Sequence, residues 1–289
     1  MHTDAVVPFV FEALQVRGAI VLLDRSWQRM LQGHDYEASV REVLGHAAAA
    51  TTLIAQSVKA DSSITLQISG DGPLSLLVMQ CGSDLRFRGM ASTQGNTAGL
   101  AFHELVTKAR CAITIDSPAS ERPYQGIVEV SADSLAASLE NYYARSAQLP
   151  SRLKLLADER LCAGILLQQM PGARRPATDD WHRLGLLAET LAPRDFQAGI
   201  GADLLGKLFA EDDLRVFEAR SADFYCRCSR HRAEEVLRLL GAEDCEAAVR
   251  EQGVLVVTCE YCARRQRFDL VDIAQLFADT AMRGSDAVH

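Results

Sequence analysis

The residues best suited to chemistry are four cysteines in the last quarter of the chain. Cys226 and Cys228 form a C-x-C pair, and Cys259 and Cys262 form a C-x-x-C pair. Each spacing can place two thiolates on one side of a tight turn. Four sulfurs from two such turns can form a tetrahedral cage for Zn²⁺, with Zn–S distances of ~2.3 Å. The pattern therefore predicts a four-cysteine zinc site, with local disulfides or unlinked thiols as the alternative.

The remaining cysteines and one histidine are weaker candidates for such a site. Cys245 lies between the two pairs without a partner at ligand spacing, so we expect a helix residue with at most a minor part in thiol exchange. His231 follows the first pair by three residues and could replace one sulfur, although four cysteines already suffice. Cys81, Cys111 and Cys162 stand singly in apolar surroundings, which predicts small core residues.

Three kinds of function are open to a four-cysteine site of this type. Most such sites are structural, and many zinc ribbons bind nucleic acid. Here arginines and acidic residues nearly balance around the cysteines, although Arg264, Arg265 and Arg267 form a local basic patch. Zinc-bound thiolates are also open to oxidation, and conversion of two of them to a disulfide would dismantle the cage. The residues permit a redox switch without requiring one.

The elements that position the cysteines form a small C-terminal domain, predicted to span residues 226–289. Ser229 is expected to cap a helix that runs to Leu240, and a second short helix ends at Gly253. Residues 254–257 read as a strand leading to the second pair, and Asp269 caps a last helix. Because a unit of this size has a thin apolar core, bound metal would contribute much of its folding free energy.

The first part of the chain, residues 1–176, predicts a large α+β domain. Strands and a few helices occur there without regular βαβ alternation. Strands are predicted over 18–23, 64–69, 74–79, 84–90, 111–115, within 121–130, and over 153–157 and 161–169; helices are predicted over 36–59 and after Ser134. No G-x-S-x-G, Walker or dinucleotide glycine motif occurs, and His34, His46 and His103 are isolated. We therefore predict that the protein is not an enzyme.

Residues 177–225, which we call the middle segment, read as a helical linker after the boundary signal from Pro171 to Pro176. One helix is predicted from Thr178 up to Pro193, a second over 202–209, and an extended piece over 214–217. Four glycines interrupt the segment: Gly185, Gly199, Gly201 and Gly206. Short helices gain most of their stability by docking an apolar face. The middle segment is therefore either an ordinary linker packed on the first domain or one whose folding depends on its neighbours.

Composition limits the function classes further. The 289 residues carry a net charge of -8, with 48% hydrophobic and 24% charged residues, which is typical of a soluble globular protein and argues mildly against nucleic-acid binding. The amino terminus lacks the pattern of a secretion signal, and no apolar run approaches the ~18 residues of a membrane helix. We expect a cytoplasmic protein without a membrane partner. In a reducing cytosol, clustered cysteines favour metal binding or redox activity over structural disulfides.

Taken together, these motifs resemble the redox-regulated 33-kDa heat-shock chaperones of bacteria. Residues 121–128, Glu-Arg-Pro-Tyr-Gln-Gly-Ile-Val, are similar to the Y-Q-G-I-V stretch of that family, and residues 146–152 to its S-E-Q-L-P-T-R stretch. The two cysteine pairs match its zinc ligands, with Phe224 before the first pair and Glu260 within the second. Two departures are Gln266, where the family often has an aromatic residue and where packing beneath the metal could loosen, and the additional Cys245.

The resemblance implies a mechanism as well as a fold. It implies a reduced, inactive form that holds one Zn²⁺ through Cys226, Cys228, Cys259 and Cys262. It further implies that hypochlorite, or peroxide with heat, forms the disulfides Cys226–Cys228 and Cys259–Cys262, releases zinc and unfolds the linker. The oxidised form would be a homodimeric, ATP-independent holdase that binds unfolded client proteins and no nucleic acid.

Two other readings stay open on the residues alone. A zinc ribbon that binds nucleic acid is the principal alternative. A thiol oxidoreductase that uses Cys259 and Cys262 is the other, but such enzymes place their C-x-x-C at a helix start in a thioredoxin-like domain, and that context is missing here.

Overall fold

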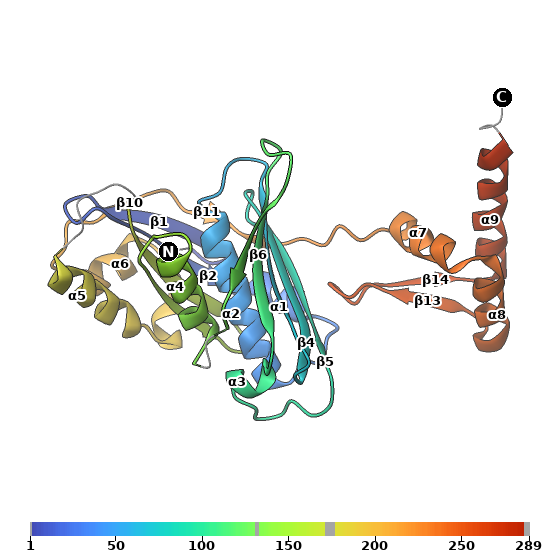
Figure 1. The fold of residues 1–289 in the computed structure, drawn as a ribbon, viewed down its shortest axis with the longest axis horizontal. Helices are drawn as coiled ribbons and strands as arrows, with labels where there is room; N and C mark the ends of the chain where they lie inside the picture. The colour runs from blue at the N-terminus through green and yellow to red at the C-terminus, as the bar shows by residue number, and fades with distance from the viewer. Residues whose placement is uncertain (1, 131–132, 171–176, 286–289) are drawn as a thin grey trace. The chain divides into compact units, whose positions relative to one another are not determined.

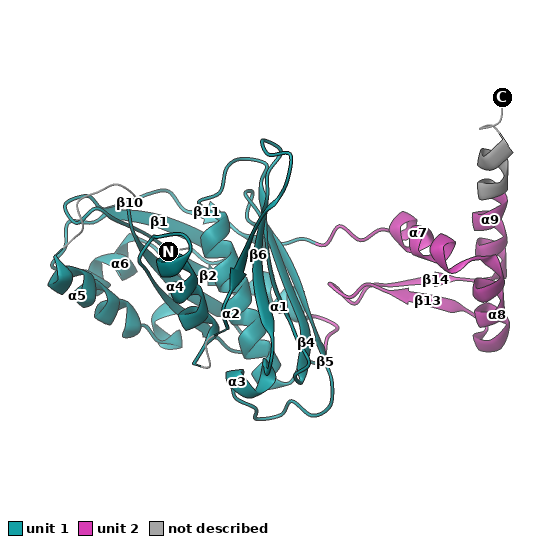
Figure 2. Cartoon of the chain, viewed as in Figure 1, with its two compact units in different colours: residues 1–31, 35–225 teal, residues 32–34, 226–289 magenta. Residues whose placement is uncertain are grey.

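The chain forms two compact units in the computed structural model, which describes residues 2–130, 133–170 and 177–285. Unit 1 comprises residues 1–31 and 35–225, and unit 2 comprises residues 32–34 and 226–289 (Figure 2). The predicted boundary at Pro171–Pro176 lies outside the described residues. The described part of the middle segment belongs to unit 1, so the division into three domains remains a prediction.

Strands of unit 1 form two sheets, each six-stranded within the described residues. The first sheet has the order β10-β1-β2-β9-β8, and β11 also pairs with β1. Its strands are β1 (Ala5–Phe11), β2 (Val16–Leu23), β8 (Ser151–Ala157), β9 (Cys162–Gln169), β10 (Arg215–Val216) and β11 (Arg220–Ser221). All of these pairings are antiparallel.

The second sheet has the order β12-β5-β4-β3-β6-β7. Its strands are β3 (Ser63–Ser69), β4 (Leu74–Gly82), β5 (Arg86–Thr93), β6 (Arg110–Asp116), β7 (Tyr124–Val128) and β12 (Asp223–Phe224). The strands pair antiparallel except for β12, which runs parallel to β5. The end of the middle segment therefore completes one edge of this sheet.

Helix α2 (Ala38–Ala55) lies between the two sheets and contacts strands of both (Figure 1). Its alanines, Ala47 to Ala50, are fully buried, and at Gly45 a Cβ would collide with Ala157. Small side chains allow the helix to approach both layers closely. This confirms the helix predicted over 36–59 and places it in the core. Shorter helices before the middle segment are α1 (Arg25–Leu31), α3 (Phe102–Leu105) and α4 (Leu135–Arg145), the last capped by Ser134 as predicted.

The middle segment covers the face of the first sheet that α2 leaves open. It contains α5 (Thr178–Glu189), a 3-10 turn η1 (Pro193–Phe196), α6 (Ala202–Leu208) and the short strands β10 to β12. Buried residues of the segment pack against alternate residues of β1, β2 and β9, among them Phe9, Phe11, Ile20, Leu22, Ile165 and Leu167. These residues point to one face because strand side chains alternate. Gly199 and Gly201 lie between the helices with φ of 88° and 157°, whereas Gly185 and Gly206 lie inside them.

Unit 2 has a separate small core between helices and a hairpin. Its elements are α7 (Arg230–Leu240), α8 (Ala242–Gln252), β13 (Leu255–Thr258), β14 (Arg265–Phe268) and α9 (Leu270–Ser285). Among the residues whose burial the structure describes, seven form its core: Ala233, Leu237, Cys245, Val249, Phe268, Ile273 and Leu276. This thin core agrees with the expectation from sequence length, and the Ser229 cap on α7 is present.

Besides the short elements α3, η1, β11 and β12, the sequence did not predict β1 and α1. β1 reads Ala-Val-Val-Pro-Phe-Val-Phe, and its Pro8 argues against a strand that is paired on both sides. Nevertheless β1 pairs fully with β2 and only partly, through two-residue strands, on its other side. α1 has no acidic residue in its first turn, which weakens its start signal. None of the described helices combines the length and the apolar composition needed to cross a bilayer.

Candidate metal centre

The hairpin of β13 and β14 positions the second cysteine pair. β13 delivers Cys259 at its end, and the turn through Cys262 returns the chain to β14. The Cys259 N–H donates to the Arg264 carbonyl at 3.0 Å, and the Ala263 N–H donates to the Cys259 carbonyl at 2.9 Å. Ala263 takes up a left-handed conformation with φ of 53°. These bonds close a tight turn that holds two thiols on one side of the hairpin's tip.

The start of α7 positions the first pair. Cys226 and Cys228 lie in the extended stretch that precedes the helix. The Ser229 hydroxyl accepts a hydrogen bond from the Arg232 N–H at 3.2 Å, which satisfies one of the free donors of the first helical turn. Because Ser229 follows Cys228 directly, this cap also fixes the position of the first cysteine pair relative to the start of α7.

The four sulfurs converge on one point. All lie within 4.8 Å of one another, with 3.6 Å between Cys226 Sγ and Cys259 Sγ and 3.3 Å between Cys228 Sγ and Cys262 Sγ. Four sulfurs held ~2.3 Å from one tetrahedral ion lie ~3.8 Å apart, whereas a disulfide needs ~2.05 Å. The four are free thiols at cage spacing. Together they could hold a metal ion, and an all-sulfur donor set is consistent with zinc.

The electrostatics of the thiols show what a cation would change. Burial raises the pKa of the Cys228 thiol well above its ordinary value, and hydrogen bonds with Cys262 and Cys226 raise it further. The neutral form of the Cys228 thiol is therefore favoured when no positive charge lies beside its sulfur. A bound divalent cation inverts this preference and holds its thiol ligands as thiolates.

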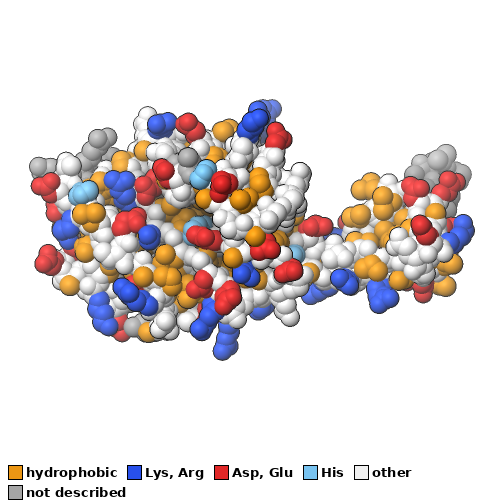
Figure 3. All heavy atoms as spheres, turned by 90° about the horizontal axis from the view of Figure 1, so that it is seen from below, with side chains coloured by type: hydrophobic (Ala, Val, Ile, Leu, Met, Phe, Trp, Pro, Cys, Tyr) orange, Lys and Arg blue, Asp and Glu red, His pale blue; other side chains and the backbone are white. Residues whose placement is uncertain are grey.

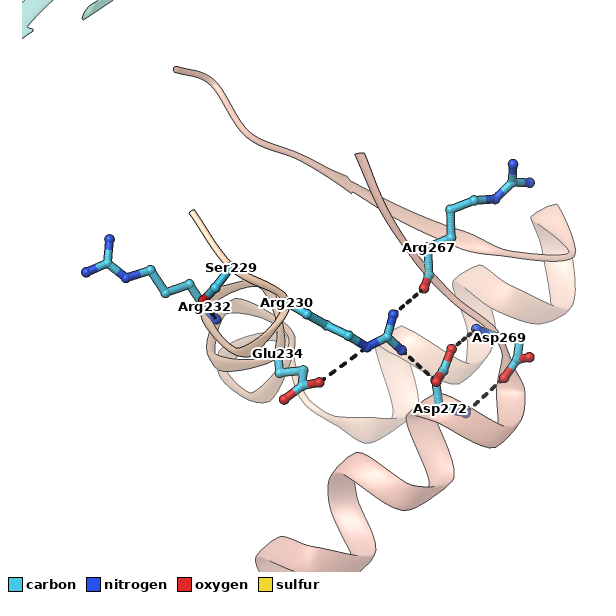
Figure 4. A network of polar contacts seen from close by, with 7 residues as sticks. All are labelled: Ser229, Arg230, Arg232, Glu234, Arg267, Asp269 and Asp272. Atoms are coloured by element: carbon cyan, nitrogen blue, oxygen red, sulfur yellow. Dashed lines mark hydrogen bonds and ion pairs between the residues drawn. The ribbon is translucent and has the colours of Figure 1, made fainter. Parts of the chain in front are cut away.

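A polar network beside the cysteines joins the elements that carry them (Figure 4). Arg230, in the first turn of α7, donates to the Arg267 carbonyl at 3.0 Å and to Asp272 Oδ1 at 2.6 Å. Its guanidinium also lies 4.3 Å from the centre of the Phe268 ring. Asp269 and Asp272 exchange backbone-to-carboxylate hydrogen bonds at the start of α9. One arginine thus ties α7 to β14 and to α9 without any metal.

Sequence reasoning identified only part of this network. The predicted Asp269 cap is present, and Asp272 three residues later completes the capping-box spacing. Arg230 was counted only among the arginines near the cysteines. Its role depends on the fold of the hairpin against the helices, and no local spacing signals it.

The other candidate residues lie apart from the four sulfurs. His231 is exposed, with Nδ1 3.6 Å from Glu235 Oε1, and does not belong to the group. Cys245 is buried in α8, where its thiol lies 3.5 Å from the Leu237 carbonyl, which confirms a helix residue. Cys81, Cys111 and Cys162 are buried in unit 1, as predicted for core residues. Within the described residues, the four paired cysteines are the one group of this kind with metal-ligand spacing.

Comparison with known proteins agrees with the motifs and the fold. The family model described as Hsp33 protein matches residues 4–269. The 33 kDa chaperonin of Nitrosococcus oceani is 40% identical over 278 residues, which cover 96% of each chain. That of Methylobacillus flagellatus is 38% identical over 290 residues, covering 99% of each.

The fold likeness extends to a solved structure. The crystal structure of the 33 kDa chaperonin from Thermotoga maritima covers 96% of this chain and 99% of its own, with a TM-score of 0.80 at 21% identity. The mixed α+β architecture predicted from the sequence is thereby confirmed. The chain belongs to the Hsp33 family, whose members carry the name of a chaperonin and not of an enzyme.

Proposed function

We propose that this chaperone is a redox-regulated, ATP-independent holdase that binds unfolding client proteins in the cytoplasm. In its reduced form, Cys226, Cys228, Cys259 and Cys262 hold one Zn²⁺ and the protein is inactive. The observation that carries the proposal is the convergence of these four sulfurs within 4.8 Å in a unit with a small buried core. Because that core is thin, the stability of unit 2 depends on the metal, and so on the redox state of the thiols.

The oxidative step is balanced by an oxidant such as hypochlorous acid. Two thiolates lose two electrons and form one S–S bond, while one hypochlorous acid accepts the electrons and leaves as chloride and hydroxide. Two such steps consume all four thiolates. Zinc then has no thiolate ligand left in the group and dissociates.

The proposed disulfides are Cys226–Cys228 and Cys259–Cys262, as the resemblance to the family implies. In the reduced geometry two close sulfur pairs run between the turns, at 3.6 Å for Cys226–Cys259 and 3.3 Å for Cys228–Cys262. Pairing across the turns would tie α7 to the hairpin. Pairing within each turn leaves the two turns unlinked, so that loss of zinc frees them from each other. Disulfide mapping by mass spectrometry of the oxidised protein distinguishes the two patterns.

The middle segment is the element that this change would release. It ends at Tyr225, directly before Cys226, so the first ligand and the segment share a continuous backbone. Its last contacts with the rest of unit 1 include the two-residue pairing of β12, the Tyr225 N–H bond to the Phe87 carbonyl at 2.9 Å, and an ion pair of Asp223 with Arg29 at 2.6 Å. Both partners of that ion pair are more than half exposed, so the ion pair itself stabilises the segment little.

Unfolding of the middle segment would expose a large apolar surface on the first sheet. Phe9, Phe11, Ile20, Ile165 and other side chains beneath α5 and α6 are buried only while the segment stays docked. An exposed apolar patch of this kind binds the apolar segments of unfolding proteins without sequence preference. We further propose that the oxidised protein associates into a homodimer, because such a surface favours association.

A single experiment tests the proposal. Suppression of aggregation of a thermally unfolding client is measured before and after hypochlorite treatment, while a chromogenic chelator follows zinc release. We expect activity to appear together with zinc release. Equal activity in both states would refute the redox switch. Salt-dependent binding of nucleic acid by the reduced protein would favour the zinc-ribbon alternative instead. Figure 3 gives that alternative no support on the visible face of unit 1, because acidic and basic side chains are mixed there.

A variant of the middle segment sharpens this test. Arg183 in α5 forms two hydrogen bonds with the Asp212 carboxylate, at 2.8 and 2.6 Å, and the Asp212 side chain is 7% exposed. Arg183→Gln removes a bidentate charged pair, which we expect to destabilise the docked segment by about 1–3 kcal/mol and to raise the activity of the reduced protein. Arg194→Gln, at an exposed position of the same segment, is the matched control.

A further inference from the structure

Three of the four sheet edges in unit 1 carry features that prevent pairing with another chain. In the first sheet, two-residue strands β10 and β11 form one edge. β8 forms the other edge and carries Arg152 and Lys154, which pair with Glu140 and Glu189. In the second sheet, the two-residue β12 covers β5. Very short edge strands and charged side chains are common devices that keep sheet edges from recruiting further strands.

The fourth edge, β7, lacks these devices. Its five residues, Tyr-Gln-Gly-Ile-Val, include no charged residue and no proline, and all five pair with β6. No described residue pairs with its outer side. In an antiparallel pair, alternate residues of the edge strand direct their N–H and C=O groups away from the partner. β7 therefore presents free backbone donors and acceptors beside uncharged side chains.

Apolar side chains and a hollow accompany this edge. Ile127 is 65% exposed and Tyr124 is 54% exposed. A hollow of about 580 Å³ lies beside the strand, lined by Val106, Ile127 and Val128, with Lys108 and Arg110 also at its wall. Exposed β-branched and aromatic residues next to free backbone groups favour addition of a strand.

We propose that β7 binds an extended segment of the unfolded client as an additional strand of the second sheet. This inference rests on the proposed holdase function and names the mode of client recognition. Hydrogen bonds to the main chain do not depend on the client's sequence, and the hollow accommodates alternate apolar side chains. A chaperone for many clients needs both properties. The five-residue strand, ~17 Å long, suits one short segment of a client.

The size of the edge favours a client over a second copy of this chain. Stable interfaces between folded proteins bury ~800 Å² on each partner and use about 20–30 residues a side. A five-residue strand offers much less, whereas peptides bind to single sheet edges in this manner. The edge is also accessible while the middle segment is docked. It would therefore provide a weak contact in either redox state, and oxidation would add the apolar face of the first sheet.

The test uses the full-length oxidised protein and a reduced, carboxymethylated and permanently unfolded protein as client. Hydrogen–deuterium exchange follows the amides of residues 124–128 with and without client, and fluorescence anisotropy gives the affinity. We expect the client to slow exchange in β7, and Ile127→Lys to weaken binding about fivefold by placing a charge on the edge. Ile127→Thr, which keeps a β-branched residue without charge, should weaken binding less. Leu239→Lys in α7, also at an exposed apolar position, is the matched control and should bind as the wild type does.

Each outcome supports or overturns the proposal. Normal client binding without protection of β7, or unchanged affinity of Ile127→Lys, overturns the edge-strand mode alone. If the wild type binds no client in either redox state, the proposed function fails and this inference fails with it. If Ile127→Lys turns a dimer into a monomer by analytical ultracentrifugation, the edge is an interface between copies. Because Ile127 is exposed, we expect the variants to keep the thermal unfolding profile of the wild type.

Discussion

The two units contain the same reactive residue in opposite environments. In unit 1, burial raises the pKa of Cys81 and of Cys111 to about 12, and that of Cys162 well above its ordinary value. In unit 2, the four paired cysteines are only partly buried and lie within 4.8 Å of one another. Partial exposure and mutual proximity therefore favour thiol chemistry at these four cysteines over the buried cysteines of unit 1. The contrast depends on solvent access and mutual distance, and not on the number of cysteines.

The largest expected effect comes from removing one proposed ligand. Cys259→Ser should abolish stoichiometric zinc binding and unfold residues 226–285, because structural zinc contributes ~10–16 kcal/mol in small zinc-finger peptides. Metal analysis and hydrogen–deuterium exchange measure both effects. Cys111→Ala, a change at a buried thiol of unit 1, is the control and should retain zinc. Retention of zinc by Cys259→Ser would remove this residue from the ligand set.

The next effect is a difference in the rate of alkylation between the thiols of unit 2 and the buried thiols of unit 1. At pH 8, a thiol with a pKa of about 12 is ionised roughly a thousandfold less than one with the ordinary value of 9.0. Chelation of the metal should unfold unit 2 and expose its thiols, so an alkylating reagent should label them long before the buried Cys81 or Cys111. Mass spectrometry of the labelled peptides gives the order. Early labelling of Cys111 in the folded protein would contradict the contrast.

In unit 1, acid should act through His46. Burial, with a contribution from Lys154, lowers the pKa of His46 to about 4 from 6.5. Between these values the unfolded chain binds a proton that the folded chain does not. Stability should therefore be complete above pH 6.5 and fall by up to about 3 kcal/mol as the pH drops towards 4.

Tryptophan fluorescence can follow this loss, because both tryptophans, Trp27 and Trp181, lie in unit 1. Urea unfolding at pH 7 and at pH 4.5 gives the two stabilities. His46→Gln should flatten the pH dependence, and His103→Gln, at an exposed position, should not. If the free energy of unfolding depended on pH equally in the two variants, His46 would be excluded as the source of the pH dependence.

The smallest effect concerns the contacts within unit 2 that do not involve the cysteines. Arg230→Gln removes the contacts with Asp272, the Arg267 carbonyl and the Phe268 ring. Because the ion pair is partly exposed, we expect a loss of about 1–2 kcal/mol and faster zinc transfer to a chelator. In Figure 4 the Arg232 side chain points away from this network, which makes Arg232→Gln the control. If Arg230→Gln and the wild type transferred zinc to the chelator at the same rate, the Arg230 contacts would not contribute to holding the metal in unit 2.

Local signals in the sequence predicted much of the molecule. The Ser134 and Ser229 caps, the alanine-rich helix between the sheets and most alternating strands were confirmed, because each depends on residues a few positions apart. β1 was missed, because its pairing with β2 overrides the strand-breaking character of Pro8. The parallel pairing of β12 with β5 joins residues more than 130 positions apart, and no local pattern specifies it.

The candidate metal centre divides in the same way. By itself the sequence determined which four cysteines can share an ion, because ligand spacing within each tight turn is a property of neighbouring residues. Only the tertiary structure decided that the two turns meet, with Arg230 joining α7 to β14 and α9 beside them. The position of β7 at a sheet edge likewise depends on the pairing of distant strands. Long-range packing determines these features, since the free energy of burial depends on what surrounds a residue and not on its place in the chain.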